Sequence, residues 1–185
     1  MKNKIILLLI LILVANNSFA ENFNINAKNI SIDKKNEITI FRDNVSIIDE
    51  KKNIIKSDYA SYDKKTDFFI LKNNVSIKDP RGNILRSDEA NYNKKNNLYK
   101  VIGNAKILTA EGYTVDTSDV TLDTFKKTLF SKKKTRIEDL QYNLIELDNF
   151  EYLSFENIFK SIGNIKITDK LKNSYEFSQI YIDEK

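Results

Sequence analysis

Residues 56–65 read KSDYASYDKK, and residues 86–95, thirty positions later, read RSDEANYNKK. Self-similarity at a fixed interval indicates a repeat architecture, in which one structural unit recurs along the chain. A second motif keeps the same interval: RDNVSI at 42–47, KNNVSI at 72–77, IGNAKI at 102–107, the degenerate copy KKKTRI at 132–137, and IGNIKI at 162–167. The chain therefore consists of about five copies of a 30-residue unit.

The aligned copies place apolar residues at alternate positions. Ile77 follows Val75 by two residues, and Tyr92 follows Ala90 by two, a spacing that puts both side chains on one face of a strand. The apolar columns are Val45, Val75, Ala105, Thr135 and Ile165; Ile47, Ile77, Ile107, Ile137 and Ile167; Ala60, Ala90, Val120, Phe150 and Ile180; Tyr62, Tyr92, Leu122, Tyr152 and Ile182; and Thr39, Phe69, Tyr99, Leu129 and Phe159. Each unit is predicted to contain two strands, and the units to stack around one continuous core over residues 27–183.

Polar segments between these strands have the composition of tight turns. DKKN at 33–36, DKKT at 63–66 and NKKN at 93–96 begin with Asp or Asn, whose side chain can accept bonds from the backbone two residues on. DPRGN at 79–83 adds Pro80, which fixes φ, and Gly82, which permits a positive φ. These segments are predicted to be hairpin turns. A helix over EYLSFENIFKS at 151–161 is an alternative, but the column alignment continues through it and favours strands.

The composition excludes most familiar catalytic machinery. The chain of 185 residues contains no Cys and no His, which removes disulfides, thiol nucleophiles, histidine-based triads and most zinc sites. Its 4 Gly residues do not form a phosphate-binding loop. We therefore expect no enzyme activity, no cofactor and no metal site.

The first twenty residues have the organisation of a secretory signal peptide. Lys2 and Lys4 precede an apolar run over residues 5–15, and small residues stand at the expected cleavage positions up to Ala20. The apolar run is too short for a membrane-spanning helix. We expect cleavage after Ala20, leaving residues 21–185 as one domain with a basic excess of only two charges, which gives no indication of nucleic-acid binding.

The recurring pattern NVSI…KSDYASYDKKTDFFILKNNVSI resembles the OstA-like family. In that pattern one strand is expected to end in Asn-Val and the next in Asp-x-Ala-x-Tyr-Asp, and a Gly-Asn is expected to close each unit. The family includes the periplasmic lipopolysaccharide transport protein LptA, the membrane-anchored LptC and the N-terminal domain of the outer-membrane assembly protein LptD. The resemblance covers essentially the whole chain after residue 20, but the fourth copy, SKKKTRIEDL at 131–140, replaces Gly-Asn with lysines.

The resemblance implies a V-shaped, half-open β jelly roll of stacked antiparallel strands, whose apolar trough shields the acyl chains of lipopolysaccharide. It implies a periplasmic location and a role in lipopolysaccharide transport and outer-membrane assembly. Association of the protein with the outer membrane is a further possibility. The trough columns then give these lipid-binding candidates: Val45, Ile47, Ala60, Tyr62, Phe69, Val75, Ile77, Ala90, Tyr92, Tyr99, Ile107, Val120, Ile137 and Ile167. The basic cluster of Lys132, Lys133, Lys134 and Arg136 is a weaker candidate for contact with lipid phosphates, and a solvated loop is the alternative.

The edges of an open strand stack suggest protein partners. Unpaired edge strands near residues 27–33 and 177–183 could pair head to tail with other OstA-like domains and with the outer-membrane assembly complex. The charges of Lys28, Asp33, Asp183, Glu184 and Lys185 could instead only protect these edges. The sequence leaves open whether the chain corresponds to LptA or to the N-terminal domain of a longer LptD.

Two other classes of protein remain as alternatives. An enzyme on a parallel β-helix would need a carboxylate cluster. The candidate column for such a cluster is Asp58, Asp88, Ser118 and Asp148, with Asp33, Asp63, Asn93 and Asp123 nearby. Acidic residues at repeated turns are usually caps, which disfavours catalysis. An adhesin or structural β-solenoid without lipid binding is the third possibility.

Overall fold

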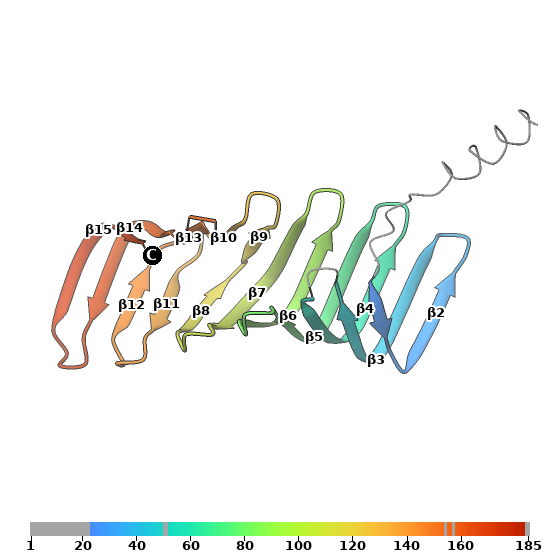
Figure 1. Cartoon of the computed structure of the whole chain (residues 1–185), viewed down its shortest axis with the longest axis horizontal. Coiled ribbons are helices and arrows are strands. Elements are labelled where there is room, and N and C mark those ends of the chain that lie inside the picture. Colours follow the sequence, from blue (N-terminus) through green and yellow to red (C-terminus); the bar gives the residue numbers. More distant parts are fainter. Residues whose placement is uncertain (1–22, 50–51, 154, 157, 184–185) are drawn as a thin grey trace, which may run out of the picture.

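The structure is a computed structural model that describes residues 23–49, 52–153, 155–156 and 158–183. The described residues form strands and turns without a helix, in one antiparallel sheet of 15 strands. Its strands are β1 (Asn24–Asn26), β2 (Asn29–Asp33), β3 (Ile38–Ile48), β4 (Ile54–Asp63), β5 (Phe68–Lys78), β6 (Ile84–Asn93), β7 (Leu98–Leu108), β8 (Thr114–Ser118), β9 (Thr121–Asp123), β10 (Thr128–Ser131), β11 (Thr135–Glu138), β12 (Leu144–Leu147), β13 (Phe150–Leu153), β14 (Ile158–Thr168) and β15 (Ser174–Asp183). Figure 1 shows them side by side along the long axis, from β2 to β15. The predicted all-β repeat fold is confirmed. The described residues of 151–161 belong to β13, β14 and the turn between them, so the alternative helix is not formed there.

Long strands bend near their middle, at residues in the left-handed backbone conformation. In β3 these are Asp43 and Asn44, with φ of 64° and 56°, and the ladder to β4 shifts register there. The equivalent pair in β5, Asn73 and Asn74, has φ of 62° and 54°. Such a bulge bends the strand without ending it. The interpretation of Asn-Val as a strand end is therefore wrong, because the strand continues through the bulge.

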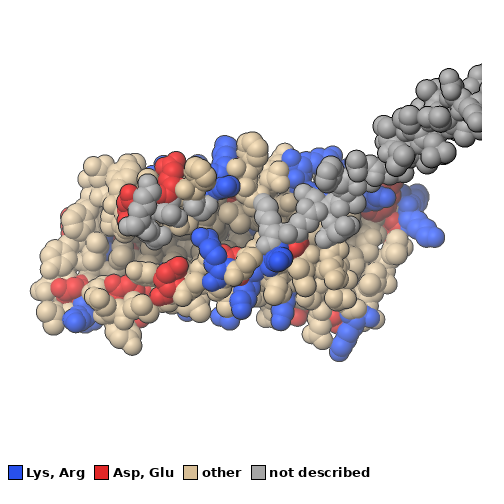
Figure 2. Space-filling model, in the orientation of Figure 1, with Lys and Arg blue, Asp and Glu red and all other residues tan. Residues whose placement is uncertain are grey.

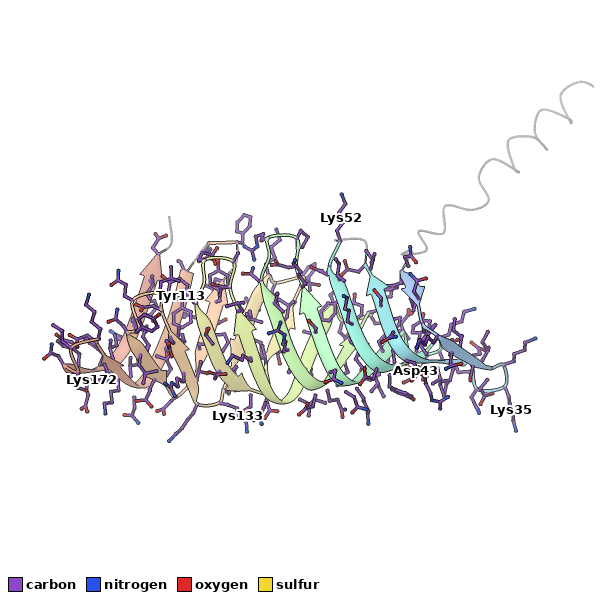
Figure 3. All side chains as sticks on the ribbon, turned by 90° about the horizontal axis from the view of Figure 1, so that it is seen from below. Lys35, Asp43, Lys52, Tyr113, Lys133 and Lys172 are labelled. Atoms are coloured by element: carbon purple, nitrogen blue, oxygen red, sulfur yellow. The ribbon has the colours of Figure 1, made fainter. Side chains whose placement is uncertain are left out.

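The aligned bends fold the sheet into two walls. We call the turns at 33–37, 63–67, 93–97, 123–127 and 153–158 rim A, and the strand halves that lead to them wall A. We call the turns at 49–53, 79–83, 109–113, 139–143 and 169–173 rim B, and the strand halves that lead to them wall B. In Figure 3, Asp43 and Lys133 mark the bend along one margin, and Lys52 marks rim B at the opposite margin.

The bend is interrupted between β7 and β14. Here the repeat strands are split, so that β8, β11 and β12 belong to wall B while β9, β10 and β13 belong to wall A. In the fourth copy the strand stops at Ser131 and resumes at Thr135, with Lys132, Lys133 and Lys134 between them. The departure from the repeat pattern at SKKKT thus coincides with a break in the sheet.

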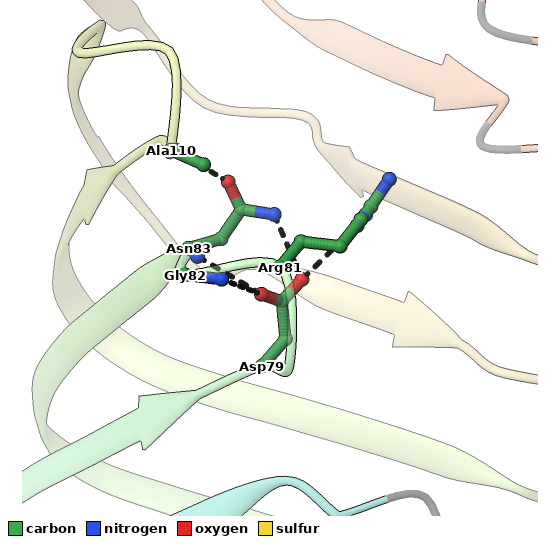
Figure 4. A network of polar contacts seen from close by, with 5 residues as sticks. All are labelled: Asp79, Arg81, Gly82, Asn83 and Ala110. Carbon is green, nitrogen blue, oxygen red and sulfur yellow. Dashed lines mark hydrogen bonds and ion pairs between the residues drawn. The ribbon is translucent and has the colours of Figure 1, made fainter.

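Rim turns are stabilised by the side chain of their first residue, as predicted. The Asp79 carboxylate accepts bonds from the backbone N–H groups of Gly82 and Asn83, both at 2.9 Å, and from the Asn83 amide at 2.7 Å (Figure 4). The Asn83 amide oxygen then accepts the N–H of Ala110 in the next rim B turn at 2.8 Å. Partial burial acts to raise the pKa of Asp79, but these bonds and Arg81 outweigh it and hold the pKa below its usual value. One turn is thereby tied to the next.

The apolar core lies between the two walls. Its largest cluster joins residues of β3 to β7 with Val120 of the β8–β9 connection, and a smaller cluster lies under β11 to β14. In the described part of the chain, no helix has both the length and the apolar character needed to cross a bilayer. The expected signal peptide, residues 1–20, lies outside the described residues.

Candidate functional site

The predicted lipid-binding columns line the inner faces of the two walls. Val45, Ile47 and Ile107 belong to wall B, and Ala60 and Phe69 to wall A. Most of the fourteen candidates are buried: Val45, Ile47, Ala60, Phe69, Val75, Ala90, Tyr92, Tyr99, Ile107, Val120 and Ile137. The other three, Tyr62, Ile77 and Ile167, are half-buried. The columns therefore face one interior, as the resemblance implies.

Over β3 to β7 the two walls pack directly against each other. A single cluster contains Val45 and Ile47 from wall B and Phe69, Tyr92 and Tyr99 from wall A. Val45 and Ile47 are each only 2% exposed. Over this part of the chain, the apolar trough implied by the resemblance is thus filled by the protein's own side chains.

Two contacts bridge the mouth of the trough from rim B to wall A. The ring of Phe23, which precedes β1, lies 5.2 Å from the ring of Phe69 and 6.3 Å from that of Tyr92, measured between centroids. The Tyr99 hydroxyl donates to the carboxylate of Asp49 at 3.3 Å. We call these two contacts the mouth bridge.

A row of aromatic rings runs along the inner face of wall A below rim A. Tyr62 stacks on Phe69 with centroids 4.3 Å apart, and Tyr92 stacks on Tyr99 at 4.0 Å. Tyr62 donates its hydroxyl to Asp67 at 2.6 Å. Burial, followed by this bond and the charge of Asp67, raises the pKa of Tyr62 to about 12, so the phenol is neutral at physiological pH. The row gives the mouth a broad apolar edge.

The interior is more accessible towards β15. The smaller cluster contains four buried residues, Ile137, Leu147, Phe150 and Ile165. On β15 the inward-facing column members Tyr175 and Phe177 are each 48% exposed, since no further strand covers them. Apolar surface suitable for a lipid tail is therefore exposed on the inner face of β15.

Buried hydroxyl groups line the interior where the bend is interrupted, a feature that the sequence reasoning missed. Ser131 donates to the carbonyl of Ser118 and Ser161 to the carbonyl of Asn149, both at 2.6 Å. Thr117 and Thr135 share a hydrogen bond of 2.8 Å between their hydroxyls. These bonds satisfy polar groups near the broken strands. One column of the repeat could have indicated these buried hydroxyls, because it changes from apolar residues to serine: Phe41, Leu71, Val101, Ser131 and Ser161.

The acidic column considered for catalysis stabilises the bends instead. Asp58 accepts from the Asn74 amide at 2.7 Å, and Asp148 accepts from the backbone N–H of Asn164 at 3.0 Å. In the intervening unit the acceptor is Asp119, next to the predicted Ser118, and its donor is the N–H of Gly103 at 2.9 Å. Each carboxylate thus binds a bulge in a neighbouring strand. Among the described residues, no three His, Cys, Asp or Glu side chains are grouped so that they could hold a metal ion.

The basic cluster lies on the outer side of the bend, away from the apolar interior. Lys133 approaches Asp119 with its Nζ atom 3.5 Å from the carboxylate, and Arg136 lies 4.0 Å from Glu138. Lys132 and Lys134 are exposed. The exposed cations and the buried Thr135 and Ile137 thus point to opposite faces of the sheet, and phosphate contact by these cations stays a prediction.

Both ends of the sheet present edge strands, at the positions predicted. β2 pairs with β3 only, and β15 pairs with β14 only. On β2 the inward-facing Ile30 and Ile32 are 54% and 66% exposed. Each end thus combines an unpaired backbone edge with uncovered apolar side chains.

Comparison with known proteins supports the fold. No protein-family model matches the chain, and no curated protein matches it by sequence. The structure resembles that of LptH from Pseudomonas aeruginosa, the LptA-homologous periplasmic component of a lipopolysaccharide transport device, with 14% sequence identity and a TM-score of 0.52 over 59% of this chain and 80% of that one. A second match, the TCP10 domain of CPAP from Danio rerio, has 7% identity and a TM-score of 0.16 over 85% of this chain and 99% of that one, too low to bear on the fold. The chain thus has an LptA-type β jelly-roll fold.

Proposed function

We propose that this chain is a periplasmic lipopolysaccharide-binding protein that shields acyl chains between its two walls and helps to carry lipopolysaccharide to the outer membrane. The observation that carries the proposal is the set of apolar columns on facing inner walls of an LptA-type fold. The secretory features of residues 1–20 support the location. No chemical step is required, because binding follows from removal of the tails from water.

The proposed binding step is an exchange of wall-to-wall contacts for contacts between wall and lipid. Each methylene transferred from water to an apolar surface contributes about 0.8 kcal/mol. The side chains of the walls contact apolar groups both before and after the lipid binds. The favourable free energy therefore comes mainly from the removal of the lipid tails from water. Separating the walls costs free energy, and this cost is larger where the walls pack tightly than where they pack loosely.

The exposed inner surface over β14 and β15 is the proposed first contact for the tails. Phe177 and Tyr175 are already half-exposed there, whereas the mouth bridge of Phe23 and the Asp49–Tyr99 bond closes the other end. Tails would then extend towards β3 only after this bridge breaks. The trough is therefore proposed to open progressively from β15.

The edge strands are proposed to join this domain to like domains. Pairing β2 of one domain with β15 of another would continue the sheet and would cover Ile30, Ile32, Tyr175 and Phe177, which are exposed in the isolated chain. A heterologous contact of this kind extends without closing. The same geometry suits a soluble bridge protein and the N-terminal domain of a longer outer-membrane assembly protein.

A structural β-solenoid without lipid binding is the second candidate function. It is favoured by the tight packing of the walls over β3 to β7, since a stack that serves only as a scaffold needs no separable walls. It is disfavoured by the exposed inner residues of β15. The two candidates differ in whether a lipid reaches the interior.

Site-specific photocrosslinking separates them. A photoreactive residue at Ile77 or Ile107 faces the interior, whereas the adjacent Ser76 and Lys106 face outward from the same strands. We expect lipopolysaccharide to crosslink at Ile77 and Ile107 in the cell envelope. The outward positions are matched controls, because they lie one residue away on the same strand and on the opposite face of the wall.

Equal crosslinking at inward and outward positions would mean that lipid contacts the protein without entering the trough. Crosslinks at neither pair, in protein that is folded and present in the envelope, would exclude the carrier function and leave the scaffold.

A further inference from the structure

The outer face of wall B carries two rows of side chains that change character along the molecule. Cross-strand partners define the row beside rim B as Ile48, Ile54, Lys78, Ile84, Leu108, Thr114, Glu138, Leu144, Thr168 and Ser174. The neighbouring row, nearer the bend, is Ser46, Lys56, Ser76, Arg86, Lys106, Asp116, Arg136, Glu146, Lys166 and Glu176. Both rows point away from the trough, because they alternate with its buried columns.

Charges in these rows divide between the two ends of the wall. From β3 to β7 the rows contain the cations Lys56, Lys78, Arg86 and Lys106 and no carboxylate. From β8 to β15 they contain Asp116, Glu138, Glu146 and Glu176 with two cations, Arg136 and Lys166. Figure 2 agrees, with Lys and Arg over the middle of the lower margin and Asp and Glu towards the end that carries β15. The β3–β7 part of the outer face is therefore electropositive.

Three of these cations have no acidic neighbour across the ladder, and one of them, Lys78, lies between Ile54 and Ile84. Lys56 lies between Ser46 and Ser76, and Arg86 lies between Ser76 and Lys106. Later in the same row Lys106, Arg136 and Lys166 occupy the serine positions, and Asp116, Glu146 and Glu176 occupy the positions equivalent to Lys56 and Arg86, so that cations and anions alternate. On the outer face of wall A, by contrast, Lys160 lies 2.8 Å from Glu151. Within these two rows, cations without an acidic cross-strand neighbour thus lie on β4 to β6.

The same region combines a groove with exposed apolar side chains. A groove of about 630 Å³ lies between Arg86 and Lys106, with Asn74, Ser76 and Asn104 among its lining residues. It also contains Asp88 and Asp116, the latter 3.8 Å from Lys106. In the row beside rim B, Ile48, Ile54 and Leu108 are 40%, 38% and 39% exposed. An apolar and a basic outer position are adjacent on β4, β6 and β7, as Ile54 and Lys56 are.

We propose that this surface, which we call the outer patch, binds the surface of an anionic phospholipid membrane. The outer patch consists of Ile48, Ile54, Ile84, Leu108, Lys56, Lys78, Arg86 and Lys106. Its apolar row enters the headgroup region beside rim B, while its basic row, one pleat farther from the rim, contacts lipid phosphates. Basic residues next to a bilayer are attracted by the negative surface potential, and adjacent apolar side chains add burial.

The row of apolar side chains favours a membrane over other anionic partners. Free phosphate and nucleic acid would use the cations but would leave Ile48, Ile54 and Leu108 in water. A bilayer surface contacts both kinds of side chain. It is also wide enough to contact both rows across five consecutive strands, β3 to β7. This contact is separate from the proposed trough, whose side chains point to the opposite face of the wall.

Vesicle sedimentation with the full chain tests the outer patch. Protein is mixed with vesicles of phosphatidylglycerol and phosphatidylcholine, or of phosphatidylcholine alone, at low and high salt. We expect binding to the anionic vesicles only, and weaker binding at high salt. Each basic residue near an anionic surface contributes about a fivefold change in partition. The double variant Lys56→Ser/Arg86→Ser should therefore bind roughly 20-fold more weakly.

Matched variants control for net charge and for apolarity. Lys100→Ser/Lys166→Ser removes the same charge from outward strand positions elsewhere and should change binding less than about twofold. Ile54→Ser should weaken binding more than Leu144→Ser in the same row, because Leu144 lies in the acidic part. Circular dichroism and thermal unfolding verify that each variant is folded.

Equal losses in the two charge pairs, undiminished binding to neutral vesicles, or no binding of the unmodified protein to anionic vesicles would each overturn the proposal. Trough crosslinking at Ile77 is unaffected by the Lys56→Ser/Arg86→Ser variant if the two surfaces are independent. A failure of the outer patch is therefore distinguishable from a failure of the carrier function.

Discussion

At the scale of single residues, the bend depends on side chains that tolerate a positive φ. The bulge positions are occupied by Asp43, Asn44, Asn73, Asn74 and Gly103, the residue types with the lowest cost in the left-handed region. Neighbouring carboxylates then bind these bulges, as Asp119 binds the N–H of Gly103. The asparagine-rich character of the repeat therefore has a structural cause at this position.

Gly103 allows this dependence to be measured. Its φ is 77°, and a β-carbon added there meets no atom within 4 Å, so a substitution tests backbone conformation alone. We expect Gly103→Val to lower the free energy of unfolding by about 2 kcal/mol, because a β-branched side chain is strained at positive φ. Gly103→Asn should cost less than about 0.5 kcal/mol, because Asn73 adopts φ of 62° at the same column. Chemical denaturation of both variants provides the comparison, and equal losses would contradict this account of the bulge.

The turn residues were predictable from sequence, whereas the bulges were not. Asp33 and Asp63 stand first in short polar segments, and an Asx-type turn follows from local chemistry. The bulge at Asn73 and Asn74 has the same composition but lies within a strand, and only its pairing with β4 and β6 shows that the chain continues extended. Pairing between strands is non-local information that one short segment does not contain.

At the scale of elements, β1 and the residue before it determine how firmly the mouth is closed. β1 pairs with wall B at Ile47 and Ile48, which places Phe23 over rings of wall A. Four of the other positions in the Phe23 column are asparagines, Asn53, Asn83, Asn143 and Asn173, and the fifth, Tyr113, is 40% exposed. One aromatic residue therefore supplies a contact that the other units lack.

Removal of this ring should favour the open trough. We expect Phe23→Ala to increase binding of a hydrophobic dye or labelled lipopolysaccharide by roughly three- to tenfold, since loss of an aromatic pair beyond its burial is worth about 0.5–1.5 kcal/mol. Phe125→Ala, on the exposed tip of a rim A turn, is the matched control and should leave binding unchanged. Fluorescence titration of both variants measures the difference. Unchanged or weaker binding by Phe23→Ala would show that the ring does not oppose opening.

Sequence reasoning located the strands and their inner faces but not the mouth bridge. The columns follow from a period of two within strands and thirty between units, both visible in the chain. The bond between Asp49 and Tyr99 joins residues fifty positions apart, on opposite walls and in different units. Its formation depends on how the twisted walls cross, which periodicity does not specify.

At the scale of the whole molecule, the walls form one sheet that must hinge along its bends if a lipid is to enter. β3 to β7 cross the bend as continuous strands, whereas from β8 to β13 the walls are separate ladders linked by hydrogen bonds such as that of Ser131. The interrupted region thus has fewer backbone constraints on wall separation. It also adjoins β14 and β15, where opening of the trough is proposed to begin and where Tyr175 and Phe177 of the inner face are exposed.

Covalent closure of the mouth tests whether the walls separate. The chain has no cysteine, so Asp49→Cys/Tyr99→Cys introduces the only two thiols, one on each side of the mouth bridge. Joined by a short bis-maleimide, this variant should lose binding of labelled lipopolysaccharide by tenfold or more, because the walls over β3 to β7 can no longer part. Tyr59→Cys/Lys72→Cys, cross-strand neighbours on the outer face of wall A, receives the same reagent and should retain binding. If the closed and control proteins bind alike, lipid uptake does not involve separation of the walls over β3 to β7, and the exposed surface of β14 and β15 alone would have to account for it.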